Sequence, residues 1–409
     1  MTEVFDIAIS GGGMVGASLA VALRPLGLRI ALIEAVAHDA DTQPSFDERT
    51  TALSNGSRRI LETLGVWPGV AAAATPIRRI HVSDRGHFGF ARIDANTLGL
   101  DAMGYVLPNR ALGRALWDLI RADPGIRVHC PATLAEVTPG ADTALVRIAN
   151  ADGTQVLVEA NLVVAADGVG SVVRGAAGID IETRDYGQSA LITTVLPQRF
   201  HDHVAYERFT DSGPLALLPL ADGRCTLVLT HKTADVAAAL AASDAEFLAE
   251  VQHRFGFRLG RFLQAGRRVA YPLALTLARR TSGARCVIVG NAAQSLHPVA
   301  GMGFNLGLRD AATLAELIAD RSAEGRRDFG DAAMLAAYDA WRGRDRRAIA
   351  GFTDSLVRIF SNPLGIIRAA RNAGLLAFDL LPPAKSALSA LSTGASGRVP
   401  KLARGVALR

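Results

Sequence analysis

The amino-acid sequence predicts an α/β fold with an inserted, mostly antiparallel β-sheet and a helical C-terminal region. Three observations indicate this arrangement. A short apolar run near the N-terminus ends in closely spaced glycines and continues as a helix. Residues from about 186 to 272 follow the alternating pattern of antiparallel strands. From Ala311 onward the pattern is almost entirely helical.

The first glycine-rich turn predicts a Rossmann-like domain that binds a dinucleotide. The run Val4–Ser10 is typical of a buried parallel strand, and Gly11, Gly13 and Gly16 follow with the spacing G-x-G-x-x-G. In this fingerprint the glycines permit a tight turn, close approach of a pyrophosphate, and close packing of helix on strand. The next expected strand ends at Glu34, about 20 residues further on, where a ribose-binding carboxylate is expected. Such a carboxylate favours NAD or the adenosine half of FAD.

Two later strand-to-helix turns have the residues of a ligand-binding edge. In Val163–Arg174 an apolar strand ends at Asp167, and in Val287–Ile318 another ends at Asn291. Ligands of α/β sheets bind at this carboxyl edge. In the second stretch, the small residues of Gly301–Asn305 let backbone touch a flat ring at a helix start. The amides there would stabilise the negative charge of a reduced flavin.

The pattern along the chain predicts a discontinuous nucleotide-binding domain. Strands are expected separately at Gln155–Val158 and Leu162–Ala166, and a loop is expected between Glu34 and a helix at Ser54–Leu64. The expected divisions are 1–78, 105–180 and 280–330 for the nucleotide-binding domain, 79–104 and 181–275 for a substrate-binding β domain, and 331–409 for the helical C-terminal region.

Composition favours a globular protein of a reducing compartment. Apolar residues make up 49% of the chain and charged residues 20%. The three cysteines lie far apart and indicate neither a disulfide framework nor a zinc site. The pair His201 and His203 lacks further ligands nearby in sequence, so no metal site is predicted. The acidic N-terminus does not resemble a signal peptide, and we expect a cytoplasmic protein.

The C-terminal region is basic. Residues 342–409 hold twelve Lys and Arg side chains and three Asp. Such a region favours anionic lipid, an acidic partner or nucleic acid, and the scarcity of interleaved aromatic residues ranks nucleic acid last. Amphipathic segments such as 352–360 are suited to the surface of an anionic membrane, so peripheral contact with its inner face is expected. A solvated basic surface is the alternative.

The three turns, in this order and spacing, resemble the FAD-dependent aromatic hydroxylases with the para-hydroxybenzoate hydroxylase fold. Phe46–Trp67, His81–Phe90 and Gly290–Asp310 further resemble the ubiquinone-biosynthesis branch, most of all its hydroxylase of a polyprenyl-methoxyphenol. The resemblance implies resident FAD and NAD(P)H as a transient co-substrate. It also implies that reduced flavin and O2 form a C4a-hydroperoxide, whose terminal oxygen is attacked by the phenol ring. The single G-x-G-x-x-G fits this use of NAD(P)H, because no second nucleotide domain is present in the pattern.

The resemblance also implies roles for particular residues. Pro298 falls where the family places a backbone carbonyl near the reacting flavin edge, and His297 beside it is either a proton relay or a packing residue. Asn291 replaces the Asp of most members, and Met302 replaces a glutamine. The residues implied in FAD binding are Gly11, Gly13, Met14, Val15, Gly16, Glu34, Arg49, Arg110, Asp167, Gly168, Arg174, Gly290, Asn291, Gly301, Met302, Gly303, Phe304 and Asn305.

The substrate side is less defined by the sequence. Ring-binding residues are expected in the β domain, with Tyr206, Leu215 and Leu217 as candidates and plain core as their alternative. The expected partners are a polyprenyl phenol and other enzymes of the ubiquinone pathway. Alternative functions are hydroxylation at another ring position, a prenyl reductase of the geranylgeranyl reductase type, a flavin-bearing scaffold without activity, and an NAD dehydrogenase.

Overall fold

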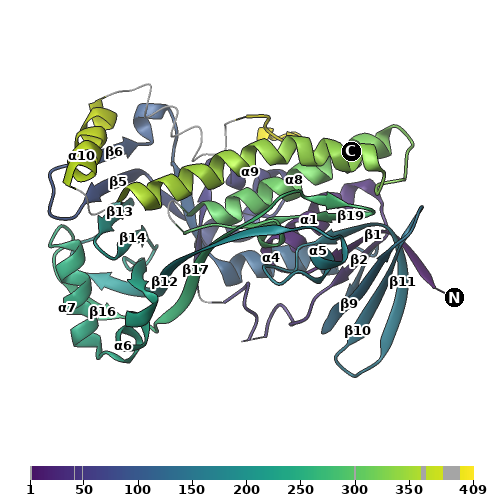
Figure 1. The fold of residues 1–409 in the computed structure, drawn as a ribbon, viewed down its shortest axis with the longest axis horizontal. Helices are drawn as coiled ribbons and strands as arrows, with labels where there is room; N and C mark the ends of the chain where they lie inside the picture. The colour runs from purple at the N-terminus through teal and green to yellow at the C-terminus, as the bar shows by residue number, and fades with distance from the viewer. Residues whose placement is uncertain (1, 41, 48, 299–300, 361–364, 381–396) are drawn as a thin grey trace.

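A computed structural model describes residues 2–40, 42–47, 49–298, 301–360, 365–380 and 397–409. Two large sheets lie side by side along the long axis of the molecule (Figure 1), and three further strands form a small third sheet. The long helix α9 (Ala332–Phe360) runs along both large sheets (Figure 1). The predicted α/β class with a second, mostly antiparallel sheet is therefore confirmed.

The first sheet has the N-terminal strand near its centre. The strands β19, β11, β1, β2 and β8 are parallel and adjacent in that order, as a Rossmann-like sheet requires. The remaining strands join this sheet antiparallel. The bounds are β1 (Glu3–Ser10), β2 (Ile30–Ile33), β8 (Ile126–His129), β9 (Ala132–Pro139), β10 (Ala144–Asn150), β11 (Gln155–Ala165), β18 (Ser282–Gly283) and β19 (Cys286–Ile288).

Successive residues of β1 pack on opposite layers of this sheet. Ile7 and Ile9 lie in the core formed with the helices, and Ala8 lies in the core formed with the β9–β10 hairpin. Burial on both sides explains why the strand reads as a continuous apolar run. The helices around this sheet are α1 (Met14–Leu23), α2 (Asn55–Thr63), α3 (Trp67–Val70), α4 (Asn109–Arg121), α5 (Val172–Ala176) and α8 (Met302–Ala323).

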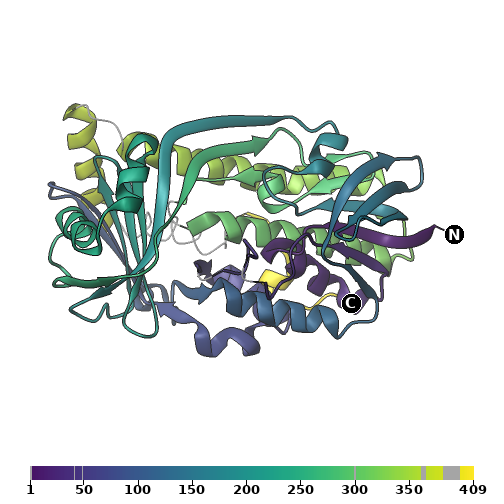
Figure 2. The ribbon, with the colours of Figure 1, turned by 90° about the horizontal axis from the view of Figure 1, so that it is seen from below.

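The second sheet is antiparallel except where β13 pairs with β5. Its longest strand, β12, arches between the two halves of the molecule (Figure 2). Helix α7 packs on the outer face of this sheet. The bounds are β5 (Arg79–Asp84), β6 (Phe90–Asp94), β12 (Ile181–Pro197), β13 (Val204–Thr210), β14 (Gly213–Pro219), β15 (Cys225–Lys232), β16 (Phe262–Ala265), β17 (Val269–Ala278), β20 (Gln294–Ser295), α6 (Val236–Ala241) and α7 (Asp244–Phe255).

Two sequence expectations were wrong in this part of the chain. The two strands expected between Gln155 and Ala166 are one continuous strand, β11. The expected loop after Glu34 contains β3 (Thr50–Ser54), which pairs with β7 (Gly104–Pro108), and β7 in turn pairs with β4 (Thr75–Ile77). Strands of three to five residues are too short for a period of two to be recognised.

The C-terminal region uses several of its basic side chains inside the protein. Helix α10 (Gly365–Leu380) packs on β6, and the last residues return to α2 and α8. Arg342 and Arg346 are buried, and Arg371 forms an ion pair with the buried Asp84. These three cations face protein groups, which reduces the basic surface expected from composition.

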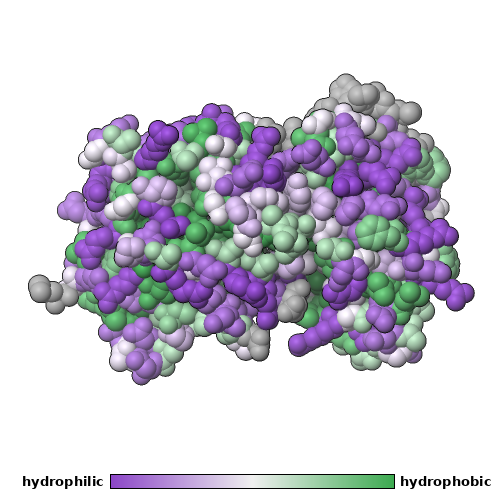
Figure 3. All heavy atoms as spheres, turned by 180° about the vertical axis from the view of Figure 1, so that it is seen from behind, coloured by the Kyte–Doolittle hydropathy of each residue, from purple (hydrophilic) through white to green (hydrophobic). Residues whose placement is uncertain are grey.

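Within the described ranges, no helix combines the length and hydropathy needed to cross a bilayer. On the face shown in Figure 3, hydrophilic side chains surround separated hydrophobic patches.

Candidate active site

A cavity of about 1560 Å³ lies between the two large sheets, and all three glycine-rich turns reach it. Pockets for a single small ligand are typically ≈ 300–1,000 Å³. The central cavity is larger, so it has room for a dinucleotide and a second molecule. At one end its wall contains backbone and carboxylates of the first sheet, and at the other it is almost entirely apolar.

The first turn requires its glycines for steric reasons. Gly11 has φ +97°, and a Cβ there would lie 2.5 Å from the carbonyl oxygen of Ala166. A Cβ at Gly16 would collide with the carbonyl oxygen of Gly11, so this glycine lets α1 lie against the strand. Gly13, Met14 and neighbouring backbone line the cavity at the start of α1. The unpaired amides of this helix start provide the electrostatics that a pyrophosphate requires.

Glu34 is held beside this turn. Its Oε2 accepts a hydrogen bond from the amide of Gly12 at 2.6 Å. Its Oε1 accepts hydrogen bonds from the amide of Val36 at 2.9 Å and from Nε2 of Gln43 at 3.3 Å. The side chain is 8% exposed and lines the cavity. The carboxylate therefore has a fixed position where a ribose would lie.

Asp167 carries a buried acceptor that lacks a partner. Its Oδ2 accepts a hydrogen bond from the amide of Val172 at 3.1 Å. Its Oδ1 is buried and receives no hydrogen bond from the described part of the chain. Burial raises the pKa of this carboxyl. Because Asp167 lines the cavity, a ligand hydroxyl or amide there would satisfy the orphaned oxygen. This observation, together with the glycine cradle, fits the predicted dinucleotide.

The third turn begins α8. Gly301 has φ +59° at the helix N-cap, and its amide donates to the carbonyl of Pro298 at 2.9 Å. The side chain of Asn305 accepts from the amide of Ser54 and donates to the carbonyl of Ala52, both at 2.8 Å. Asn305 therefore fastens the helix start to β3. Pro298 lines the cavity, although its carbonyl already accepts the hydrogen bond from Gly301.

A buried ion pair behind this turn was not recognised in the sequence. Asp310 of α8 accepts hydrogen bonds from the amide of Gly290 at 3.2 Å and from Nε2 of Gln294 at 2.7 Å. Its other oxygen accepts from Nε of Arg342 on α9 at 2.7 Å, and both side chains of the pair are fully buried. Arg342 also contacts Asp345 at 2.6 Å. The pair holds the strand-to-helix turn at Gly290, and the only sequence signal was a charge within an apolar helical face.

The structure brings most of the predicted site residues into the cavity wall. Arg49 lines the cavity, and its guanidinium lies 4.6 Å from the centroid of the Tyr271 ring and 2.6 Å from the carboxylate of Asp47. The other predicted residues that line the cavity are Gly11, Gly13, Met14, Val15, Glu34, Asp167, Gly168, Asn291, Pro298, Gly301, Met302, Gly303 and Phe304.

The remaining predicted residues lie outside the cavity wall: Gly16, Arg110, Arg174, Gly290 and Asn305. Arg174 donates to the carbonyls of Ala292 and Val169, at 3.1 and 2.7 Å, and therefore holds turns together. Gly290 has φ +58°, and a Cβ there would lie 3.1 Å from Val15. Direct contact of these residues with a cofactor stays a prediction.

Two of the histidines named in the sequence analysis, His297 and His201, and the two candidate leucines make packing or hydrogen-bond contacts inside the protein. Burial lowers the pKa of His297 to about 4, and its ring packs edge-on against Tyr186 with centroids 5.4 Å apart. His201 Nε2 lies 2.8 Å from the carbonyl oxygen of Leu220. Leu215 and Leu217 belong to the core that contains residues of α7, which is the alternative stated for them.

The fold and the three turns define a dinucleotide-binding protein with one large cavity between its two sheets. The model of the FAD binding domain family matches residues 4–351, so the chain belongs to this family. It is an FAD-dependent monooxygenase of the aromatic hydroxylase type, as the sequence resemblance predicted.

Two curated relatives cover almost the whole chain. The chain is 37% identical to ubiquinone hydroxylase UbiL of Rhodospirillum rubrum, over 99% of this chain and 94% of the relative. It is 33% identical to 3-demethoxyubiquinol 3-hydroxylase of Escherichia coli, over 91% of this chain and 94% of the relative. Among solved structures, p-nitrophenol 4-monooxygenase PnpA of Pseudomonas putida has a TM-score of 0.79 at 18% identity, covering 95% of this chain and 97% of that one. This last likeness supports the fold.

Proposed function

We propose that this protein hydroxylates the ring of a polyprenyl-methoxyphenol intermediate of ubiquinone biosynthesis, with NAD(P)H and O2 as co-substrates. The named relatives act as hydroxylases of that pathway, which supports the substrate class. The observation that carries the proposal is the cavity itself, because it continues from the predicted flavin site into an apolar chamber long enough to reach α10.

In this proposal the predicted residues hold FAD along its length. The amides at the start of α1 face the pyrophosphate, and Glu34 accepts from the adenosine ribose. Oδ1 of Asp167 accepts a hydrogen bond from the cofactor. The start of α8 at Met302 lies against the flavin ring, where its amides favour negative charge. When bound and reduced by NAD(P)H, FAD supplies the activation of O2.

The apolar chamber suits an isoprenoid tail. Its wall is formed by one face of the second sheet, the end of α9 and part of α10. Burying each methylene of a tail there contributes about 0.8 kcal/mol, so an apolar wall discriminates strongly in favour of a prenylated phenol. The residues of the chamber include Ile77, Ile80, Ile93, Leu218, Phe352, Leu356, Ile359, Leu375 and Phe378.

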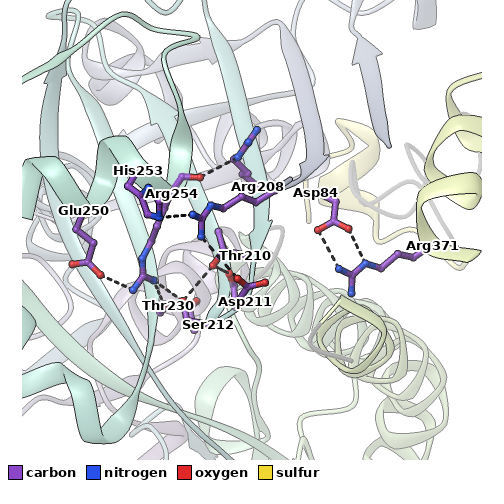
Figure 4. Close-up of polar contacts among 12 residues, drawn as sticks. Asp84, Arg208, Thr210, Asp211, Ser212, Thr230, Glu250, His253, Arg254 and Arg371 are labelled. Carbon is purple, nitrogen blue, oxygen red and sulfur yellow. Dashed lines mark hydrogen bonds and ion pairs between the residues drawn. The ribbon is translucent and has the colours of Figure 1, made fainter. Parts of the chain in front are cut away.

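Helix α10 is fastened over this chamber by a buried ion pair. Nε and Nη2 of Arg371 lie 2.8 and 3.2 Å from the two carboxylate oxygens of Asp84 (Figure 4). Asn372 donates to Asp84 at 3.0 Å and accepts from the amide of Gly89 at 2.9 Å. We call these contacts the α10 latch. Because the latch joins α10 to the β5–β6 hairpin, it keeps water out of the chamber in which the reaction occurs.

We also propose that the protein works at the inner face of an anionic membrane, where a polyprenyl phenol is dissolved, and beside other enzymes of the pathway. Arg344, Arg347 and Arg358 of α9 are exposed and provide positive charge for such contact. Sedimentation with anionic and with neutral vesicles tests this. Equal recovery of the protein with both kinds of vesicle would contradict it.

The name of the Escherichia coli relative favours a second candidate, hydroxylation at another ring position of the same pathway. The two candidates differ in the substrate that gains oxygen. Purified holoenzyme is incubated with NAD(P)H, 18O2 and either a polyprenyl-methoxyphenol or a demethoxyubiquinol. We expect the product of the polyprenyl-methoxyphenol to contain one labelled oxygen. Labelled product from the demethoxyubiquinol alone would favour hydroxylation at the other ring position. A product that gains hydrogen but no oxygen would favour a prenyl reductase.

A further inference from the structure

The cavity-facing side of the second sheet presents a straight row of residues across six adjacent strands. The register pairs Ala91 with Val82, Val82 with Glu207, Glu207 with Ala216, Ala216 with Val228, and Val228 with Ile192. All of these residues line the central cavity. Glu207 is the single polar member of the row.

The carboxyl of Glu207 has no protein partner in the described part of the chain. No hydrogen bond or ion pair reaches it, and burial alone raises its pKa to about 8. The facing residues of the two adjacent strands, Val82 and Ala216, are uncharged. The other ionisable side chains of the cavity wall contribute nothing to the shift, and they are Glu34, Arg49, Asp167 and Arg371.

The neighbouring arginine does not neutralise this carboxyl because the strand alternates. Arg208 points to the opposite face of the sheet, where its Nε donates to the carbonyl of Arg254 at 3.1 Å (Figure 4). The ring of Tyr206 packs against Phe255 on that same side, with centroids 5.3 Å apart. The half-buried carboxyl of Glu207 therefore faces the apolar chamber without a protein partner among the described residues, so it is available to accept a hydrogen bond from a ligand there.

We propose that Glu207 binds the phenolic hydroxyl of the substrate and accepts its proton, which orients the ring in the chamber and makes it more electron-rich. This proposal rests on the proposed function. In the step, the phenol O–H bond breaks and its electron pair stays on the phenol oxygen. A new O–H bond forms on the Glu207 carboxylate, and the proton later passes to solvent.

The surroundings of Glu207 match this task. A phenol titrates near pH 10 and an ordinary glutamate near 4.3, so proton transfer between them is strongly uphill. With its pKa raised to about 8, the Glu207 carboxylate is a stronger base, and the gap falls to about two units. The apolar row around it leaves the carboxyl as the polar anchor for a ring whose tail extends toward α10.

The first test compares the wild-type holoenzyme with Glu207→Gln, which preserves shape and removes the base. Glu182→Gln is the matched control, because Glu182 is an exposed carboxylate of the same sheet that pairs with Arg279. Hydroxylated product and NAD(P)H oxidation are measured between pH 6 and 9. We expect kcat for hydroxylation to rise toward pH 8 in wild type and to fall by about 100-fold or more in Glu207→Gln, with flavin content and flavin reduction unchanged. An unchanged kcat and pH profile in this variant would overturn the proposal.

A binding measurement separates this inference from the proposed function. Ultraviolet difference spectra are recorded for 2-methoxyphenol added to each protein, because the absorption band of a phenol shifts to longer wavelength when its hydroxyl donates a hydrogen bond to a carboxylate. We expect this shift with wild type and with Glu182→Gln, and a smaller shift with weaker binding in Glu207→Gln. If wild type gives this shift but hydroxylates no polyprenyl phenol, the proposed function fails and Glu207 keeps its role. Equal shifts and equal affinities in all three proteins would refute the role of Glu207.

Discussion

Replacing Arg342 by methionine tests whether the buried pair behind the third turn holds the fold and the flavin site together. The substitution removes the cation in direct contact with fully buried Asp310 and leaves the more distant Arg346 as a buried positive charge near it. Breaking a buried pair by removing one partner costs about 3–5 kcal/mol. Since Asp310 keeps the donors Gly290 and Gln294, we expect the lower end, about 3 kcal/mol. The free energy of unfolding from urea titrations measures this loss.

The same variant has a second expected effect, on the cofactor. Asp310 accepts a hydrogen bond from the amide of Gly290, so a less firmly held Asp310 side chain is expected to displace the adjacent Asn291. The ratio of bound flavin to protein should therefore fall in Arg342→Met. Arg347→Met on the same helix is the control, since Arg347 is exposed and its replacement changes stability by less than about 0.5 kcal/mol. A loss below about 1 kcal/mol in Arg342→Met would refute the reasoning.

Three further predictions follow from the site. Gly11→Ala abolishes flavin retention, because its Cβ would lie 2.5 Å from a carbonyl oxygen, whereas Gly175→Ala, in open space, retains flavin; equal absorbance near 450 nm would contradict this. Arg371→Gln opens the α10 latch and raises KM for a long-tailed phenol more than for a short-tailed one, and a uniform change would argue against a tail chamber. The free energy of unfolding falls as pH drops from 6.5 toward 4, because His297 takes up a proton in the unfolded chain but stays neutral when it is buried in the folded protein. His297→Gln is expected to reduce this dependence of stability on pH, and an identical dependence in the variant would exclude His297 as its source.

The parts of the fold that could be predicted are those in which hydrophobic periodicity or a spaced motif extends over many residues of the sequence. The glycine turn after β1 and the acid at the end of β2 follow from steric and electrostatic rules that a few residues satisfy. The sheet β3–β7–β4 could not be predicted, since its strands are short and come from segments about 30 to 50 residues apart. Pairing of such segments depends on tertiary contacts rather than on local pattern.

The residues of the proposed cofactor half could be named from the sequence, whereas Glu207 of the proposed substrate half could not. Gly11, Glu34 and Asp167 lie at strand ends, where position in the sequence indicates position in the sheet. Glu207 lies in the middle of a strand, and only the register of β13 with β5 and β14 reveals that its neighbours are apolar. The pair Asp310 and Arg342 joins two helices, so neither residue alone has a signal in the sequence.

The two halves of the cavity have opposite chemistry, and the proposed reaction would use both. The half assigned to the cofactor presents backbone and carboxylates, and the half proposed for the substrate presents an apolar wall. A phenol entering the second half loses its hydration, so its hydroxyl requires a partner there. In the proposed reaction Glu207 is that partner, and the α10 latch would exclude the water that competes for it. If Glu207 acts as proposed, the apolar wall serves catalysis as well as recognition, because burial raises the basicity of this carboxyl.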